Sequence, residues 1–442
     1  MVAHDWDFLK DINCVSREAH EIGDTSCEIR INKPRPHNIC LPANRFRIII
    51  FYMSSSINKK ATVSVQRCAD YEYENVKRAV DAVLMDVGGI ESLAKSGDRV
   101  LIKPNLLFGK SPDKAVNTHA MVVRAVMERL ADCGAKMTIG DSPSMGTAAG
   151  AAKKCGISDV AKSFGVEVIS FKDTGHVTAA EGRIYRHLPL STDALDADVV
   201  INIAKLKTHA FMTLTLGVKN LFGCVVGMAK SQWHLKAGQD PLAFARMLVE
   251  IDAAVSPALT IMDGVLAMEG NGPGSGDPRY LGMILGSREA VAMDRVILEL
   301  LGESTDRLPV IQAAREMGHG ATELSDIELR GESLASMRVK GFKLPPPPLS
   351  KRRFLPQPVQ RLLKRSLTAE PLIHDDKCTR CGTCVQACPP QIMSLKPMRK
   401  PDRSGNEKRL EIDRPRCIHC FCCQEVCPEG AITVRKGIFI RW

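Results

Sequence analysis

The chain has 442 residues, an apolar share of 45% and a formal net charge of +10. This length predicts two or three domains, and the apolar share suffices for a sizeable buried core. No run of 18 or more apolar residues occurs, so we expect no transmembrane helix. Acidic residues near the N-terminus stand where a secretory signal needs basic and apolar ones. Eight scattered cysteines suit a reducing compartment, and we expect a cytoplasmic location.

Residues 1–58 differ from the rest of the chain, because they show no clear hydrophobic period and carry Pro34, Pro36 and Pro42. Two interpretations stay open. Met53 is the true start and the upstream part is an artefact, which we favour, or the segment is a real, poorly ordered extension. We assign no function to it.

The main body, residues 59–344, alternates strand-like and helical patterns. Apolar and β-branched runs predict strands at Ala61–Arg67, Arg99–Lys103, Lys136–Gly140, Val166–Phe171, Asp198–Ile203, Leu259–Met262 and Gly282–Leu285. Helical periods predict helices at Tyr73–Val87, Thr118–Cys133, Ala148–Cys155, Ser158–Phe164, Pro241–Ala254 and Glu289–Leu301. This alternation favours an α/β domain whose mostly parallel sheet carries helices on both faces.

Polar residues come directly after four of these predicted strands. They are Lys103, Asp141, the group Lys205, Lys207 and His209, and Asp263. Ligands of open α/β sheets bind outside the carboxyl ends of the strands, so the set predicts one pocket. Each member also has a plainer interpretation: Asp141 as a turn and helix cap, the two lysines as a solvated pair, and His209 as a structural histidine.

A second polar group lies in the apolar, glycine-bounded segment Gly217–Gly223, which contains Lys219 and Asn220. A buried lysine must be paired or deprotonated, since an isolated buried charge is costly. Lys230 and His234 come next, four residues apart. The loop Gly270–Gly276 allows close approach of backbone to a ligand but matches no nucleotide fingerprint.

Residues 345–370 are expected to link the body to a further module. The stretch has four consecutive prolines from Pro345 to Pro348 and a run of basic residues, which predicts a stiff polyproline spacer. Three interpretations of the charge remain: peripheral contact with an anionic membrane, an acidic redox partner, or a solvated hinge, which we favour. No motif supports nucleic-acid binding.

Residues 371–442 carry the most specific signal, a repeated C-x-x-C-x-x-C-x-x-x-C-P pattern. The ligand candidates are Cys378, Cys381, Cys384, Cys388, Cys417, Cys420, Cys423 and Cys427. In two-cluster ferredoxins the fourth cysteine of each run ligates the other cluster. We therefore predict two [4Fe–4S] clusters, one held by Cys378, Cys381, Cys384 and Cys427, the other by Cys417, Cys420, Cys423 and Cys388. Zinc sites have no use for the third cysteine and the Cys-Pro ending. Cys422 is out of register and is predicted to be a spectator.

Several blocks of the body resemble one known family. They are Lys103–Leu107, Gly140–Pro143, Lys205–His209, Gly217–Gly223, and Asp263–Gly264 with Gly270–Pro273. In this order they are similar to the signature blocks of domain of unknown function family 362, in which a two-cluster ferredoxin often lies C-terminal to the body. The resemblance covers about residues 60–440. It implies an anaerobe-type iron–sulfur protein and assigns no reaction to the body.

Two classes of function fit these observations. In the first, the protein is an iron–sulfur oxidoreductase whose clusters exchange electrons with a small anionic ligand, held by lysines of the body. The candidate catalytic residues are Lys219, Asp141, Lys205, Lys207, His209 and Asp263. In the second, it is a non-catalytic electron carrier or a metal or cofactor assembly factor that docks on a partner protein, and oxygen and nitrogen ligands of the pocket would hold a hard metal ion. We expect a redox partner protein.

Overall fold

A computed structural model describes residues 46–48, 60–178, 187–227, 229–345, 369–398 and 407–435. The chain divides into two compact units, Met1–Asn44 and Arg45–Trp442, and every described residue belongs to the second. Most of the predicted extension and of the predicted linker therefore lies outside the described residues. No helix in the described part is long and apolar enough to cross a membrane, and the expected cytoplasmic location stays a prediction.

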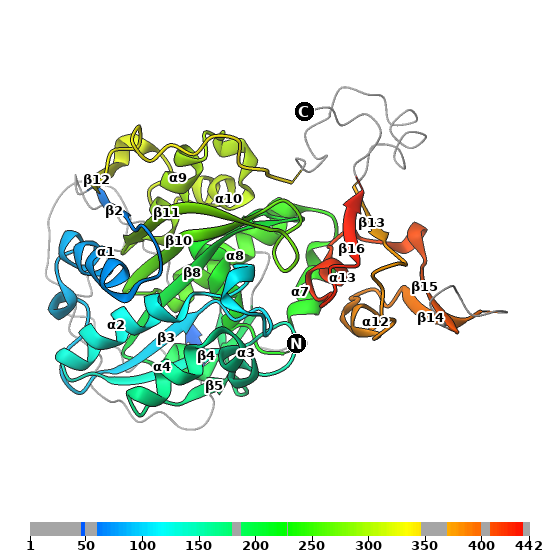
Figure 1. The fold of residues 1–442 in the computed structure, drawn as a ribbon, viewed down its shortest axis with the longest axis horizontal. Coiled ribbons are helices and arrows are strands. Elements are labelled where there is room, and N and C mark those ends of the chain that lie inside the picture. The colour runs from blue at the N-terminus through cyan, green and yellow to red at the C-terminus, as the bar shows by residue number, and fades with distance from the viewer. Residues whose placement is uncertain are drawn as a thin grey trace, which may run out of the picture. The chain divides into compact units, whose positions relative to one another are not determined.

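A nine-stranded sheet forms the centre of the body (Figure 1). In spatial order its strands are β12 (Ile327–Gly331), β2 (Ala61–Arg67), β11 (Asp277–Ser287), β10 (Leu259–Glu269), β8 (Val199–His209), β3 (Arg99–Pro104), β4 (Lys136–Asp141) and β5 (Val168–Ser170), and β9 (Thr213–Thr215) pairs with β8. The pairs from β10 through β8, β3 and β4 to β5 are parallel, as is β12 with β2. Strand β11 runs antiparallel to both of its neighbours. The predicted fold class is confirmed.

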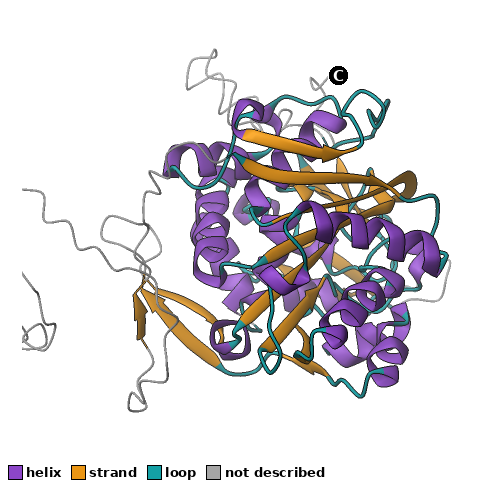
Figure 2. Ribbon diagram, turned by 90° about the vertical axis from the view of Figure 1, so that its left-hand side faces the viewer, coloured by secondary structure: helices purple, strands orange, loops and turns teal. Residues whose placement is uncertain are grey.

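Helices cover both faces of this sheet, and the strands run between them in the turned view (Figure 2). One hydrophobic core packs against α1 (Tyr73–Asp86), α2 (Ala120–Asp132), α3 (Ala148–Cys155) and α4 (Ile157–Ser163). The other packs against α5 (Thr192–Asp196), α6 (Gly217–Asn220), α7 (Ala229–Ala237), α8 (Pro241–Val255), α9 (Ala290–Leu300) and α10 (Pro309–Met317). Short 3-10 turns are Ile90–Ser92, Pro112–Lys114, Leu221–Cys224, Thr305–Arg307, Leu324–Asp326 and Arg414–Arg416.

Local sequence explains where several helices begin. The Asp240 carboxylate accepts a hydrogen bond from Leu242 N at 2.9 Å, and Pro241 occupies the first position of α8, where no amide is needed. The Thr147 hydroxyl accepts one from Gly150 N at 3.1 Å at the start of α3. These caps fix the loops that precede the helices. The loop before α3 is the one that follows β4.

Three predicted strands continue further than expected, and one of them, predicted at Gly282–Leu285, is β11 with the bounds Asp277–Ser287. The sequence predicts that β8 ends at Ile203 and β10 at Met262, but they reach His209 and Glu269. The physical reason is pairing between distant segments: the end of β8 pairs with β9, and the end of β10 pairs with β11 up to Glu269 opposite Asp277. The polar residues expected in loops after these strands therefore lie within the strands. In β8 they alternate along the strand, which places Lys205, Lys207 and His209 on one side.

The order of the strands reverses between β3 and β8. From β3 the chain proceeds outward through β4 and β5, whereas β8 and β10 lie on the opposite side of β3. At such a switch point the loops leave the adjacent strands in opposite directions, and open α/β sheets generally bind their ligands there, outside the carboxyl ends. The ends of β3 and β8 are where the sequence places most of the candidate residues. We call this region, with the loops that come after β3, β4 and β8, the switch crevice.

The cysteine-rich module forms two small antiparallel sheets. Strand β13 (Glu370–Ile373) pairs with β16 (Ile432–Arg435), and β14 (Met393–Pro397) pairs with β15 (Lys408–Ile412). Helices α12 (Thr383–Ala387) and α13 (Cys422–Glu425) come after the first cysteines of the two runs. Cysteines make up much of the core of this module.

A third small sheet, β1 (Phe46–Ile48), β6 (Thr174–Thr178) and β7 (His187–Ser191), flanks the body.

Candidate functional site

A fully buried ion pair joins the ends of β3 and β4. The Lys103 ammonium lies 3.0 Å from Asp141 Oδ1, and the two side chains are 0% and 4% exposed. The Asp141 carboxylate also accepts hydrogen bonds from Leu106 N and Ser142 N, each at 2.8 Å. Both charges are desolvated. Removing one partner of the pair would therefore leave an uncompensated buried charge and destabilise the fold. Asp141 therefore fixes the loops after β3 and β4 rather than offering a free carboxylate.

Gly223 lies directly against this pair. A Cβ atom at this position would come within 2.1 Å of Asp141 Oδ1 and 2.5 Å of Lys103 Nζ. No side chain fits there without moving a buried charge. The last glycine of the Gly217–Gly223 block is therefore explained by close packing on the ion pair.

Replacing Gly223 by alanine is expected to lower the free energy of unfolding by about 1–3 kcal/mol, the usual cost of forcing a methyl group into a packed site. Urea unfolding followed by circular dichroism measures it. Gly150→Ala is the control, since that position is exposed and its Cβ would meet only the Thr147 hydroxyl at 3.1 Å. Equal stability of the Gly223 variant and the natural chain would contradict the packing argument.

A second buried ion pair joins β8 and β10. The Lys205 ammonium lies 2.8 Å from Asp263 Oδ2 and donates to the Tyr71 hydroxyl at 2.8 Å. The Tyr71 hydroxyl in turn donates to Asp263 Oδ1 at 2.6 Å, and its ring stacks on His119 at 3.6 Å. Burial lowers the pKa of Lys205, and the charge of Asp263 opposes that shift. Both carboxylate oxygens of Asp263 thus have partners, as those of Asp141 do.

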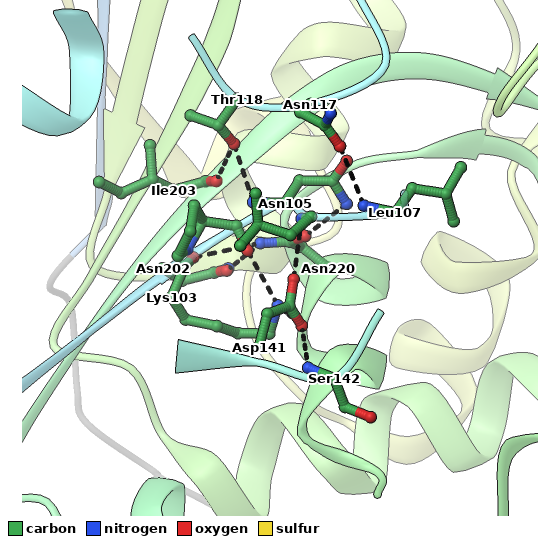
Figure 3. A network of polar contacts seen from close by, with 12 residues as sticks. Lys103, Asn105, Leu107, Asn117, Thr118, Asp141, Ser142, Asn202, Ile203 and Asn220 are labelled. Carbon is green, nitrogen blue, oxygen red and sulfur yellow. Dashed lines mark hydrogen bonds and ion pairs between the residues drawn. The ribbon is translucent and has the colours of Figure 1, made fainter. Parts of the chain in front are cut away.

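Lys207 is buried and is bound by neutral oxygens. Its ammonium donates to Asn105 Oδ1 and to Val116 O, each at 2.7 Å. Burial lowers the pKa of Lys207 to about 7, with the charge of Glu425 acting in the opposite direction. The Asn105 amide donates to Asn220 Oδ1 at 2.9 Å, and Asn220 donates to Asn202 Oδ1 at 2.7 Å. Figure 3 shows this chain of amides running beside Lys103 and Asp141.

His209, at the end of β8, has a fixed tautomer. Its Nδ1 atom accepts hydrogen bonds from Phe211 N at 3.1 Å and Met212 N at 3.2 Å, so that nitrogen carries no proton. The proton of the neutral ring must then sit on Nε2. Burial lowers the pKa of His209 to about 4, with the charge of Lys219 adding to the effect. His209 is therefore a neutral hydrogen-bond donor, and its donor is the Nε2–H group.

Lys219 is a buried cation without a close counter-charge. In the described part of the chain its ammonium forms no hydrogen bond or ion pair, and it lies 5.7 Å from the centroid of the Phe222 ring. Burial lowers its pKa, and the more distant charge of Glu425 opposes the shift. His234 is nearby, stacked at 4.3 Å on Phe244, and its Nδ1 is buried without a hydrogen-bond partner among the described residues. The Lys219 ammonium and His234 Nδ1 can therefore form hydrogen bonds with a ligand, whereas the groups of the two ion pairs already have partners.

The module reaches this group of residues through its second cysteine run. Glu425 Oε2 lies 3.6 Å from His209 Nε2, and Ser144 Oγ lies 3.5 Å from Glu425 Oε1. The Gln424 amide donates to Asn271 O at 3.0 Å and to Gly272 O at 3.1 Å. Burial alone would raise the pKa of Glu425, but the contact with His209 and the charge of Lys219 lower it well below its usual value. Glu425 is therefore an anion at the mouth of the switch crevice.

The glycine loop Gly270–Gly276 has a packing role. A Cβ at Gly272 would come within 2.3 Å of Thr208 O, and one at Gly274 would meet the Phe108 ring at 2.7 Å and Glu425 O at 3.1 Å. The loop thus approaches the backbone of β8 and of the module closely.

The eight ligand candidates line two separate cavities in the module. One is lined by Cys378, Cys381, Cys384 and Cys427, and the other by Cys388, Cys417, Cys420 and Cys423. In each, three cysteines of one run meet the fourth cysteine of the other. Four thiols around a small cavity fit a [4Fe–4S] cluster. In the described part of the chain no three His, Cys, Asp or Glu side chains are arranged to hold a single metal ion.

The structure brings together most of the candidate residues and separates their roles. Asp141 and Asp263 are bound to Lys103 and Lys205, whereas Lys207, Lys219 and His209 keep capacity for a ligand. Lys230, half-buried, donates to Ser142 O beside the first pair. The sequence argument missed Tyr71, Gln424 and Glu425. Nothing near Tyr71 in the sequence marks it, and the last two were hidden between ligand cysteines.

Family models match two parts of the chain. "Domain of unknown function (DUF362)" matches residues 100–299, and "4Fe-4S dicluster domain" matches residues 377–431. The chain thus has a ferredoxin domain that binds [4Fe–4S] clusters. The C-terminal position of this domain agrees with the arrangement that the cysteine runs predict.

Relatives match the body and the module separately. A thylakoid-associated protein of Synechocystis sp. is 41% identical over 261 residues, 59% of this chain and 81% of the relative. NADH-quinone oxidoreductase subunit I of Pelobacter propionicus is 38% identical over 63 residues, 14% of this chain and 34% of the subunit. The ferredoxin-type protein NapG of Haemophilus influenzae is 39% identical over 57 residues, 12% and 20% of the two chains. The module is thus similar to short parts of two redox proteins, and the chain spans about a third or less of the length of each.

Among solved structures, the lactate racemase apoprotein of Thermoanaerobacterium thermosaccharolyticum is similar over 53% of this chain and 57% of its own. The TM-score is 0.37 and the sequence identity 14%. A likeness at this level carries no argument about ligand or activity.

Proposed function

The chain belongs to the DUF362 family, and from this premise we propose that it exchanges electrons, through two [4Fe–4S] clusters, with a small anionic ligand bound in the switch crevice. The observation that carries the proposal is the contact between the second cysteine run and the end of β8, where Glu425 lies 3.6 Å from His209. A module that only handed electrons to other proteins would have no need to place its ligand loop against polar groups of the body.

Three residues would bind the anion. Lys219 supplies a desolvated charge, Lys207 a second one, and His209 a neutral Nε2–H donor of fixed direction. Charge-assisted hydrogen bonds of this kind are strong for carboxylate and phosphate groups. Lys103 with Asp141, and Lys205 with Asp263, would hold the walls of the crevice in position. The reaction would be an iron–sulfur oxidoreduction.

The clusters would be held as the crossed runs predict, by Cys378, Cys381, Cys384 and Cys427, and by Cys388, Cys417, Cys420 and Cys423. The separate lining of two cavities by these sets supports the assignment. Bound there, the clusters supply single-electron transfer. One relative of the module is named as a subunit of an NADH-quinone oxidoreductase and another as a ferredoxin-type protein, and these names favour a redox partner protein for the module.

Two cysteine variants test the assignment of the cluster ligands. Cys427→Ser is expected to lower iron and acid-labile sulfide per chain by about half, because a cluster needs its fourth thiolate. Cys422→Ser is the control: this buried thiol lies in the same run but lines neither cavity in the described part of the chain. Full iron content in the first variant, or loss in the second, would refute the assignment.

The function itself is tested by EPR spectroscopy of anaerobically purified, dithionite-reduced protein, alone and with small carboxylates and phosphate esters. We expect two interacting [4Fe–4S]⁺ signals, of which at least one changes when the anion binds. Signals that ignore every small anion would favour the second candidate, an electron carrier that docks on a partner. The similarity of the module to subunits of larger complexes is the observation behind that alternative.

A further inference from the structure

The Glu425 carboxylate lies against His209, one of the groups proposed above to bind the anionic ligand. Its two carboxylate oxygens face two groups of the body: Oε1 faces the Ser144 hydroxyl in the loop after β4, and Oε2 faces His209 Nε2 at the end of β8. The side chain is 14% exposed, so it is inserted between the module and the body rather than extended into water.

The carboxylate is held loosely. Its contacts with Ser144 and His209 are 3.5 and 3.6 Å, at or beyond the limit of a hydrogen bond, and His209 Nε2 has no hydrogen-bond partner among the described residues. A buried donor without a partner is costly. An anion able to approach these groups at ordinary hydrogen-bond distance would therefore bind better than Glu425 does.

The segment that carries Glu425 is anchored independently. Gln424 donates to the backbone of Asn271 and Gly272, and the Gln239 amide donates to Cys417 O at 3.2 Å. Phe421 packs into the main core of the body. The position of the run against the body thus does not depend on the Glu425 carboxylate, which is free to serve another purpose.

We propose that Glu425 is a built-in competitor for the anion site: its carboxylate occupies the crevice until a carboxylate or phosphate group of the ligand displaces it. This inference rests on the proposed function and adds a regulatory element to the same site. Loading of the crevice then requires the ferredoxin module to release a side chain. Ligand binding therefore changes the contacts of the segment that carries Cys417, Cys420 and Cys423.

The test is calorimetric titration of the full-length, cluster-loaded protein with inorganic phosphate and, separately, with acetate. Glu425→Gln keeps the shape and removes the competing charge, and we expect it to bind at least one of the two anions at least about fivefold more tightly than the natural chain. Glu429→Gln is the matched control, because this exposed residue lies four positions along in the same module. The double variant Lys219→Met with Glu425→Gln should lose the gain.

Equal or weaker binding by Glu425→Gln would overturn the proposal, as would an equal gain in Glu429→Gln, which would indicate a general charge effect. Iron and sulfide per chain are measured in each variant. If the glutamine variant loses iron, Glu425→Asp replaces it, since its shorter carboxylate should compete less and give a smaller gain. Tighter anion binding with unchanged EPR signals would refute electron delivery to the ligand while leaving the competitor role intact.

Discussion

Replacing Asp141 by asparagine is expected to lower the free energy of unfolding by about 3–5 kcal/mol, the usual cost of leaving one member of a buried ion pair alone. The Lys103 ammonium, 0% exposed, would keep only Pro104 O at 3.1 Å and a neutral amide in place of its counter-charge. One carboxylate oxygen that accepts a backbone amide would also become a donor group. Urea unfolding of the full-length, cluster-loaded chain, followed by circular dichroism, measures the loss.

Two variants make this result interpretable. Asp113→Asn removes an exposed carboxylate whose partner, Lys114, is also exposed, and it should leave stability unchanged. The double variant Lys103→Met with Asp141→Asn removes both charges and should recover part of the loss. A single variant as stable as the natural chain would mean that the pair is not desolvated in solution.

This expectation changes how the candidate residues are interpreted. From sequence, Asp141 and Lys219 are both candidate catalytic residues, Asp141 after a predicted strand and Lys219 in the apolar segment Gly217–Gly223. The structure gives them different physical roles, because Asp141 has three partners within 3.0 Å and Lys219 has none at hydrogen-bond distance among the described residues. Loss of function in an Asp141 variant would therefore reflect loss of structure, whereas Lys219 can be tested for binding.

Much of the fold is determined by local sequence. The alternating periods predict the strand Ala61–Arg67 and the helix Ala148–Cys155 with the bounds that the structure has. They also place polar residues at one edge of the sheet. Local sequence does not determine how far β8 and β10 extend, because those ends are stabilised by pairing with β9 and β11. Strand β9 has only three residues, too few to show a period.

Local sequence also does not identify the partner of each buried lysine. The rule that a buried lysine must be paired or deprotonated does not say which carboxylate pairs with Lys103 or Lys205. Their partners come from 38 and 58 residues away. Glu425 shows the limit most clearly, since it reaches His209 from 216 residues away and from a separate module. Only the docking of that module creates the contact.

Replacing Lys219 by methionine is expected to weaken anion binding in the switch crevice by roughly 10- to 150-fold, because a hydrogen bond to a charged group is worth about 1.5–3 kcal/mol. Methionine keeps the apolar stem against Phe222, so stability should change little. Titration with inorganic phosphate and the anion-induced change in the EPR signal measure the effect. Lys236→Met is the control, since this exposed cation lies over Trp233 on α7 and outside the crevice.

The dependence of this binding on pH provides an independent check on the same residue. Only protonated Lys219 attracts an anion, and burial lowers its pKa from the ordinary value of 10.5. Affinity should therefore be highest at low pH and fall as the pH rises through the lowered pKa, well before an exposed lysine would lose its proton. The methionine variant should lack this step while keeping any step due to Lys207, whose pKa is about 7. An unchanged profile in the variant would assign the charge that binds the anion to Lys207 and remove Lys219 from the site.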